Sequence, residues 1–218
     1  MEITVVRQIM EWNEDCSEEI KALLRENNVF MVNVMGSPGA GKTSLIVELA
    51  ARLAPAYRVG VIEGDVAGQI DALRIAALGL PVVQLNTEGA CHIEAMSIQH
   101  ILPHFDLRQL DVLFVENIGN LVCPAEFNIG EDLRLAMLSI PEGDDKVEKY
   151  PLMFSVADAL VLHKYDMTPH FVFDDVKVEN QLKAINPKAS LFRISVPQGS
   201  GLAEITEWLM AKIRAKLQ

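Results

Sequence analysis

The stretch Gly36–Thr43 reads GSPGAGKT and decides the fold of this chain. It fits the pattern G-x-x-x-x-G-K-[ST], in which successive backbone N–H groups and a helix N-terminus bind phosphate. Residues 29–35 before it form an apolar, β-prone run, and apolar residues recur at helical spacing over residues 44–53 after it. Glycines between a strand and a helix let the backbone turn sharply and approach an anion. The sequence therefore predicts a phosphate-binding loop (P-loop) with a nucleoside triphosphate as its ligand.

The residue types in the P-loop predict its contacts with the nucleotide. Lys42 is expected to reach the β- and γ-phosphates, and the Thr43 hydroxyl is expected to join the shell of a bound Mg²⁺. Backbone N–H groups of the loop and of the first helical turn supply the other contacts. The expected phosphate-binding residues are Gly36, Ser37, Gly39, Ala40, Gly41, Lys42, Thr43 and Ser44.

Composition narrows the class of protein. The chain has 218 residues, which suits a single α/β domain with its own core. Its net charge of −11 disfavours binding to nucleic acid or to an anionic membrane surface. No apolar run approaches the roughly 20 residues that span a bilayer, and the first residues lack the basic and apolar segments of a secretory signal. Three cysteines are too few for a disulfide framework, so a reducing, cytoplasmic setting is expected.

Strand and helix signals alternate after a charged N-terminal segment. Residues 1–27, rich in Glu and Lys, predict a helical extension of one amphipathic helix or a helix pair, and residues 28–218 predict the P-loop domain. The expected strands are 29–35, 58–63, 82–85, 111–116, 134–139, 157–163 and 190–195. The expected helices are 42–53, 67–78, 91–103, 171–185 and 200–216, with a long polar loop over 141–151. The alternation predicts an α/β fold with a doubly wound, mostly parallel sheet flanked by helices, and a ligand at the carboxyl ends of its strands.

Acidic residues stand at strand ends beside the P-loop. Asp65 and Glu116 follow predicted strands, and Asp71 lies near the start of the next predicted helix. Mg²⁺ binds a few oxygen ligands and keeps several waters, so these carboxylates are candidates for the ion or for positioning the attacking water. Gly119 is placed to donate its N–H to the γ-phosphate and so to sense hydrolysis. Alternatively, each carboxylate is simply exposed to solvent at the end of a strand and binds nothing. The expected Mg²⁺ ligands are Thr43, Asp71 and Glu116, and the expected catalytic groups are Lys42, Asp65 and Glu116.

A second group of residues is expected at the base. His163-Lys164-Tyr165-Asp166 follows a predicted strand, where guanine-specific P-loop proteins usually carry Asn-Lys-x-Asp. Asp166 would accept bonds from guanine N1–H and the exocyclic amine, which adenine cannot reproduce, and the Lys164 stem would pack on the base. The imidazole of His163 can still donate to guanine N7 or to the P-loop. Ser195, after the last strand, is expected to offer a second, backbone contact. GTP is therefore favoured over ATP.

Two thiols and one imidazole form a candidate metal site. Cys91 and His92 open the helix expected at 91–103, and Cys123 lies seven residues after Glu116. These ligands suit Zn²⁺ or Ni²⁺, and three of them leave a four-coordinate ion one short, which a second copy of the chain could supply. Three unrelated core residues are the alternative, because free cysteine is commonly buried and no C-x-x-C pair is present. Met96 fits a position in the core, and His100 fits a position on the surface, better than either fits a metal ligand.

Five segments carry a resemblance to one family. They read GSPGAGKT over 36–43, EGD over 63–65, NTEGACH over 86–92, ENIGNLVCPAEF over 116–127 and EGDDK over 142–146. With them the chain resembles the HypB family, the nickel-insertion GTPases of [NiFe]-hydrogenase maturation, over about residues 8–216. Glu116–Phe127 is the most specific part. The related urease GTPase UreG has a Cys-Pro-His metal motif instead, whereas this chain has a Cys-His pair and a separate Cys.

The resemblance implies a GTPase that forms a homodimer on binding GTP. It implies Ni²⁺ or Zn²⁺ on Cys91, His92 and Cys123 at the dimer interface, beside the γ-phosphate sensor. It also implies a nickel-delivery partner chaperone and a hydrogenase large subunit precursor as partners. Turnover is expected to be slow, because no Gln or Arg is obviously placed for catalysis.

The chain departs from the family pattern in three places. It lacks the N-terminal Cys-rich motif and the His-rich tract of some members, so high-affinity or storage nickel binding is not expected. Glu88-Gly89-Ala90 stands where members often carry Gly-Lys, which removes an expected phosphate contact between subunits, and His163 replaces Asn. Two other functions stay open. One is a nucleotide-gated metal scaffold or storage protein with little hydrolysis. The other is a P-loop kinase for a small molecule, which would need an Arg-rich lid where residues 64–90 offer only Arg74.

Overall fold

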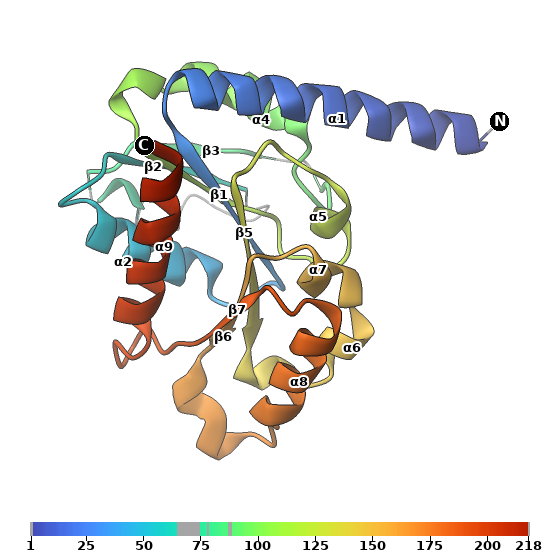
Figure 1. Ribbon diagram of the computed structural model, residues 1–218, viewed down its shortest axis with the longest axis vertical. Helices are drawn as coiled ribbons and strands as arrows, with labels where there is room; N and C mark the ends of the chain where they lie inside the picture. Colours follow the sequence, from blue (N-terminus) through green and yellow to red (C-terminus); the bar gives the residue numbers. More distant parts are fainter. Residues whose placement is uncertain (1, 65–74, 78, 87–88, 218) are drawn as a thin grey trace.

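A parallel β-sheet between two layers of helices forms the body of the protein (Figure 1). The computed structural model describes residues 2–64, 75–77, 79–86 and 89–217, with side chains from residue 10 onward. Within that part of the chain, seven strands lie in the order β3-β2-β4-β1-β5-β6-β7, and every pair is parallel. The strands are β1 (Phe30–Gly36), β2 (Val59–Glu63), β3 (Val82–Gln84), β4 (Val112–Glu116), β5 (Leu133–Ser139), β6 (Ala159–His163) and β7 (Ser190–Arg193). The doubly wound fold is confirmed, and its sheet is entirely parallel.

Strand β1 shows why the sheet has two buried faces. Its residues alternate between faces, so Phe30, Val32 and Val34 join the apolar cluster beneath α2 (Lys42–Leu53) and α9 (Leu202–Leu217). Met31 and Met35 point to the opposite face, where they belong to two separate clusters.

The opposite face is divided between two groups of helices. The first cluster there lies beneath α1 (Glu2–Glu26) and α4 (Ala95–Ile101), which run side by side at one end of the molecule in Figure 1. The second lies beneath α5 to α8. These helices are α5 (Cys123–Glu126), α6 (Lys146–Lys149), α7 (Pro151–Ser155) and α8 (Asp175–Ile185). The short 3-10 helices are η1 (Leu102–His104), η2 (Leu107–Gln109), η3 (Ile140–Glu142) and η4 (Tyr165–His170).

The N-terminal segment is one continuous helix, and its second half belongs to the core. Cys16, Ile20 and Leu24 of α1 are buried in the cluster shared with α4. The helix ends at Glu26, and Asn28 two residues later has a left-handed φ of 55° that lets the Val29 N–H bond back to the Leu24 carbonyl.

The prediction of a helix over 91–103 is wrong at its start. Residues 91–94 are irregular, and α4 begins at Ala95. The backbone there is held by distant side chains, because the Ile93 N–H donates to Asn117 and the Ala95 N–H donates to Asn13.

Two other expected boundaries are also corrected. The segment 141–151 is not a long loop, since η3, α6 and the start of α7 occupy it. A capping box between Ser139 and Glu142 starts η3. Helix α8 begins at Asp175, four residues later than expected, because the Asp174 side chain caps it. The helix expected over 67–78 lies almost wholly outside the described residues. None of the described helices has the length and apolar character needed to cross a membrane.

Candidate functional site

The P-loop connects β1 to α2 at the carboxyl edge of the sheet. Gly41 caps α2 with a left-handed φ of 98°, and any Cβ at this position would collide with the His163 ring. Lys42 is buried, and its Nζ lies 3.4 Å from the Gly36 carbonyl and 3.2 Å from the Ser37 carbonyl. The ammonium group therefore already lies over the loop where a phosphate would bind.

A cavity of about 480 Å³ opens above this loop. It is lined by the P-loop on one side and by the segment Glu116–Gly119 on the other, with Lys164 at its rim. The Thr43 hydroxyl donates to Glu116 Oε1 at 3.0 Å, which joins two of the three expected Mg²⁺ ligands. Asp65 and Asp71, the other predicted acidic residues, lie outside the described residues, so their roles stay predictions.

Gly119 lies against the P-loop. A Cβ at this position would lie 2.8 Å from both the N and Cα of Pro38. Only a glycine lets the two backbones approach this closely without a shift. The segment expected to sense the γ-phosphate is therefore in direct contact with the loop expected to bind it.

The residues expected to read the base lie on the loops after β6 and β7, and Lys164 among them lines the cavity. Lys164 has a left-handed φ of 54° and donates from Nζ to the Gly39 carbonyl at 2.7 Å. The Ser195 hydroxyl donates to Asp166 Oδ1 at 2.6 Å. Ser195 was expected to offer its backbone to a base, and the structure adds that its buried side chain orients the carboxylate expected to read guanine.

His163 contacts the P-loop rather than solvent. Its Nδ1 lies 2.7 Å from the Ala40 carbonyl, so this nitrogen carries the proton and donates it. Burial lowers the pKa of His163, against a smaller opposing effect of the bond to Ala40, so the ring is neutral at pH 7. Of the two roles that the sequence left open for this imidazole, the structure shows the contact with the P-loop.

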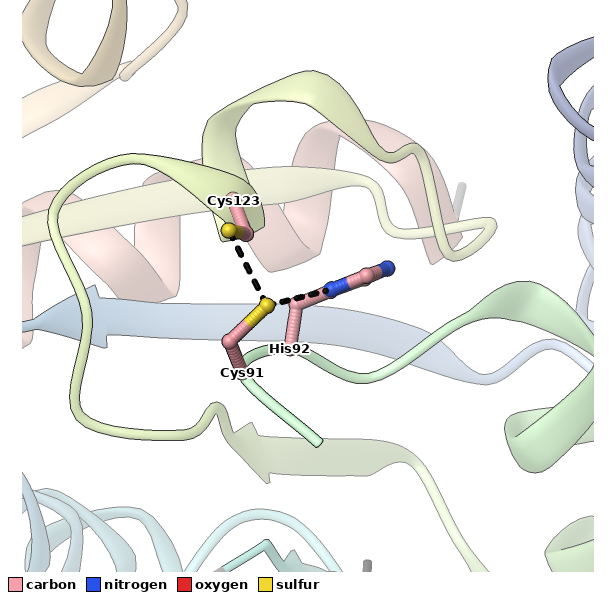
Figure 2. Close-up of side chains that lie close together, drawn as sticks. All are labelled: Cys91, His92 and Cys123. Atoms are coloured by element: carbon pink, nitrogen blue, oxygen red, sulfur yellow. Dashed lines mark hydrogen bonds between the residues drawn. The ribbon is translucent and has the colours of Figure 1, made fainter. Parts of the chain in front are cut away.

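Cys91 and His92, from one loop, meet Cys123, the first residue of α5 (Figure 2). The two Sγ atoms are 3.0 Å apart, and Cys91 Sγ is 3.4 Å from His92 Nδ1. All three ligand atoms lie within 4.8 Å of one another, close to the spacing of two ligands that each lie about 2.3 Å from one ion. Across the described residues, this is the one group of three His, Cys, Asp or Glu side chains with such geometry. His100, on α4, is not part of it, and Met96 packs against the core.

His92 is already in the state that binds a cation, whereas Cys91 must first lose a proton. Burial lowers the pKa of His92, although Glu94 and Glu126 oppose this, so its ring is neutral and able to bind a metal. The His92 ring stacks on Phe127 with centroids 4.0 Å apart, which fixes its orientation. The bond to Cys123 and burial raise the pKa of Cys91, so its thiol is protonated at neutral pH. A divalent ion would displace this proton on binding.

Comparisons with known proteins identify the family. A family model described as "CobW/HypB/UreG, nucleotide-binding domain" matches residues 30–193. The hydrogenase maturation factor HypB of Azotobacter vinelandii is 40% identical over 210 residues, which cover 95% of this chain and 68% of the relative. The chain belongs to the HypB family. The hydrogenase/urease maturation factor HypB of Helicobacter hepaticus is 37% identical over 214 residues, covering 96% of this chain and 88% of that protein.

Solved structures of the HypB family have the same fold. HypB from Helicobacter pylori, crystallised in complex with nickel, superposes with a TM-score of 0.88 at 35% identity and covers 94% of this chain and 97% of its own. HypB from Archaeoglobus fulgidus superposes with the same TM-score and identity, covering 93% and 99%. The expected P-loop fold and the family resemblance are both confirmed.

Sequence reasoning missed Asn120, which joins the two halves of this HypB-family site. Its backbone N–H donates to the Gly36 carbonyl of the P-loop at 3.1 Å. Its side chain donates to the Cys91 carbonyl at 3.2 Å and accepts from the Val122 N–H at 2.8 Å. No local pattern predicts the bonds to Gly36 and Cys91, because both residues are distant from Asn120 in sequence.

Proposed function

We propose that this chain is a GTPase that binds nickel and delivers it during hydrogenase maturation. The single observation that carries the proposal is the segment from Glu116 to Cys123. It begins at the wall of the cavity above the P-loop and ends at a thiol of the candidate metal site. The names of its relatives, and the nickel complex of the Helicobacter pylori protein, support nickel as the cargo and hydrogenase as the client. Zn²⁺ fits the same ligands.

The nucleotide half would act mainly by positioning phosphate. Lys42 would exchange its present contacts with the Gly36 and Ser37 carbonyls for the β- and γ-phosphates. Thr43 and Glu116 would hold a Mg²⁺, which neutralises charge on the transferred phosphoryl group. Gly119, in contact with the P-loop, would register whether the γ-phosphate is present.

Base selection would rest on Asp166. Its carboxylate, held by Ser195, would accept the two donors of the guanine edge. Because His163 uses its single proton on the P-loop, it has none for guanine N7. We therefore infer that this chain selects GTP with fewer contacts than relatives that carry Asn at this position.

A second copy of the chain would complete the metal site. Cys91, His92 and Cys123 supply three ligands, and Cys91 is exposed. A two-fold axis at this surface would bring three more ligands to the same place, so a homodimer could fill the coordination sphere. Binding of GTP would favour this dimer, and hydrolysis would release the metal to a client. A nickel-donating chaperone would load the site, and a hydrogenase large subunit precursor would receive the ion.

A titration with Ni²⁺ tests the proposal. Ni²⁺ affinity and molecular mass would be measured with GDP and with a non-hydrolysable GTP analogue, in wild type, Cys123→Ala and Asn120→Ala. The two nucleotide states of the wild type should differ by about 5- to 150-fold in Ni²⁺ affinity, the range of an ordinary coupling energy. Cys123→Ala should bind less Ni²⁺. Asn120→Ala should bind both ligands with a smaller difference between the two states, because it loses the bond to the Cys91 carbonyl.

Several outcomes would contradict this function. Equal Ni²⁺ affinity with both nucleotides would contradict the proposed switch, and an unchanged molecular mass would contradict the nucleotide-dependent dimer. An unchanged Ni²⁺ stoichiometry in Cys123→Ala would show that this thiol is not a metal ligand. Metal binding without any GTP turnover would favour the alternative function, a nucleotide-gated storage or scaffold protein.

A further inference from the structure

One side chain of α1 contacts both loops that carry the metal ligands. Asn13 Oδ1 accepts from the Ala95 N–H at 2.9 Å, at the first residue of α4. Asn13 Nδ2 donates to the Asn128 carbonyl at 2.8 Å. The single amide therefore joins two segments that lie more than 30 positions apart in the sequence, through one acceptor and one donor.

The two bonds lie close to the ligands. Ala95, the first residue of α4, is three residues after His92, and residues 93–94 between them are irregular. Asn128 directly follows Phe127, whose ring stacks on His92, and it is five residues after Cys123. Any change in the separation of these two loops would also change the distance between His92 and Cys123.

The rest of α1 does not need Asn13 to stay in place. Ile20 and Leu24 are fully buried against the sheet, and Cys16 is nearly so. Gly130 approaches the helix so closely that a Cβ there would lie 2.6 Å from Ile20 Cγ2. The helix is anchored by this packing, which makes it a fixed support from which Asn13 can hold two irregular loops.

Two hollows flank the same residue. One of about 270 Å³ is lined by Asn13, Glu126 and Phe127 together with other residues of α1, and one of about 190 Å³ is lined by Asn13, Cys16, Glu94 and Met96 among others. The loops therefore meet α1 with open space on either side of Asn13. The two amide bonds cross this gap. They act together with apolar packing, because Ile93, Ala95 and Ile129 of the same segments are buried in the cluster that also holds Cys16 and Ile20 of α1.

We propose that Asn13 is a positioning residue of the metal site, which sets the separation of the Cys91–His92 loop from the Cys123 loop. This role rests on the proposed function, in which these residues bind nickel. Groups that orient metal ligands through hydrogen bonds commonly change metal affinity 10- to 100-fold when they are removed. Asn13 acts one step further away, through backbone groups, so about 10-fold is expected here.

Three variants separate this role from a general effect on folding. Asn13→Ala removes both bonds. Asn13→Asp keeps an acceptor for the Ala95 N–H but has no proton for the Asn128 carbonyl, so it removes one bond and keeps the bond to the first N–H of α4. Asn27→Ala is the matched control, because Asn27 lies just after the same helix and its side chain donates to the Leu23 carbonyl one turn earlier.

The experiment uses Ni²⁺ as the probe and adds a readout that needs no metal. Asn13→Ala should bind Ni²⁺ about 10-fold more weakly, with a shifted thiolate-to-nickel absorption band at saturation and unchanged GDP affinity. Asn13→Asp should lie between Asn13→Ala and wild type, and Asn27→Ala should match wild type. Without metal, amide hydrogen exchange should quicken in residues 91–96 and 123–130 of Asn13→Ala, with the strands unchanged.

The outcomes distinguish the two proposals. Wild-type Ni²⁺ affinity and exchange rates in Asn13→Ala would overturn the role of Asn13. An equal loss of GDP and Ni²⁺ affinity, with an unchanged absorption band, would show general loosening and would also overturn it. If the wild type itself binds no Ni²⁺, the proposed function fails, and the exchange rates still decide whether Asn13 holds the two loops.

Discussion

Replacing Asn117 with alanine should destabilise the protein far more than an ordinary loop substitution. Asn117 is 1% exposed, and its amide makes three bonds. Its Oδ1 accepts from the Ile93 N–H at 3.3 Å and from the Ile118 N–H at 2.9 Å. Its Nδ2 donates to Asn33 Oδ1 at 3.1 Å. Alanine would leave three buried polar groups without these partners.

The magnitude follows from those three groups. A buried donor or acceptor left unsatisfied costs about 1–3 kcal/mol, so the low end of the range gives about 3 kcal/mol for Asn117→Ala. For a chain of 218 residues this corresponds to a fall in Tm of about 6–12 °C. Asn120→Ala is the matched comparison, since it lies three residues along the same segment but its side-chain bonds are exposed. Water can replace those bonds, so its cost should stay below about 1 kcal/mol.

Urea unfolding and differential scanning calorimetry measure both variants. Asn33→Ala provides an internal check, because Asn33 also donates to Glu131 Oε1 at 3.3 Å and shares one bond with Asn117. The double variant Asn33→Ala/Asn117→Ala should cost about 1 kcal/mol less than the sum of the single variants. The reasoning is refuted if Asn117→Ala costs no more than Asn120→Ala, or if the double variant is strictly additive.

Three shorter predictions concern His163, Ser195 and Gly119, which surround the expected nucleotide site. Burial lowers the pKa of His163, so its contribution to the free energy of unfolding should be fully present above about pH 6.5 and should fall as the pH decreases below that value. His163→Asn should therefore reduce the fall in Tm between pH 7 and 5. Ser195→Ala removes the 2.6 Å bond to Asp166 and should weaken GDP binding about 5-fold in a fluorescent-nucleotide displacement assay, with ATP binding unaffected. Gly119→Ala places a Cβ 2.8 Å from the P-loop backbone and should weaken binding of a GTP analogue at least about 5-fold in the same assay.

Much of the fold was predictable because its signals are local. The apolar run before Gly36 and the helical spacing after Lys42 are each contained in about ten residues, and both elements appear where expected. The start of α4 was not predictable in this way. Two asparagines from distant parts of the chain, Asn13 and Asn117, bind the backbone there and hold it out of the helix.

In the candidate site too, the residues with local signals were predictable and those with long-range contacts were not. Residue types and the family pattern point to Cys91, His92 and Cys123, and the structure brings them together. The side chains that support them make bonds across long sequence separations, and an asparagine in a loop carries no signal of its partner. His163 shows the same limit, since the sequence leaves two partners open for its imidazole, guanine N7 or the P-loop, and the structure shows the bond with the Ala40 carbonyl of the P-loop.

The proposed link between nucleotide and metal would need no large conformational change. The Gly36 carbonyl accepts both from Lys42 Nζ and from the Asn120 N–H, and the Asn120 side chain donates to the Cys91 carbonyl. If Lys42 turned to a phosphate, one of the two bonds at Gly36 would be lost, and the remaining bond from Asn120 would be free to change. A single bond of this kind contributes about 0.5–1.5 kcal/mol, and a useful coupling between two sites is about 1–3 kcal/mol. One or two hydrogen bonds of Asn120 would therefore be enough to carry the proposed switch, since the phosphate and the metal would bind at opposite ends of a segment only eight residues long.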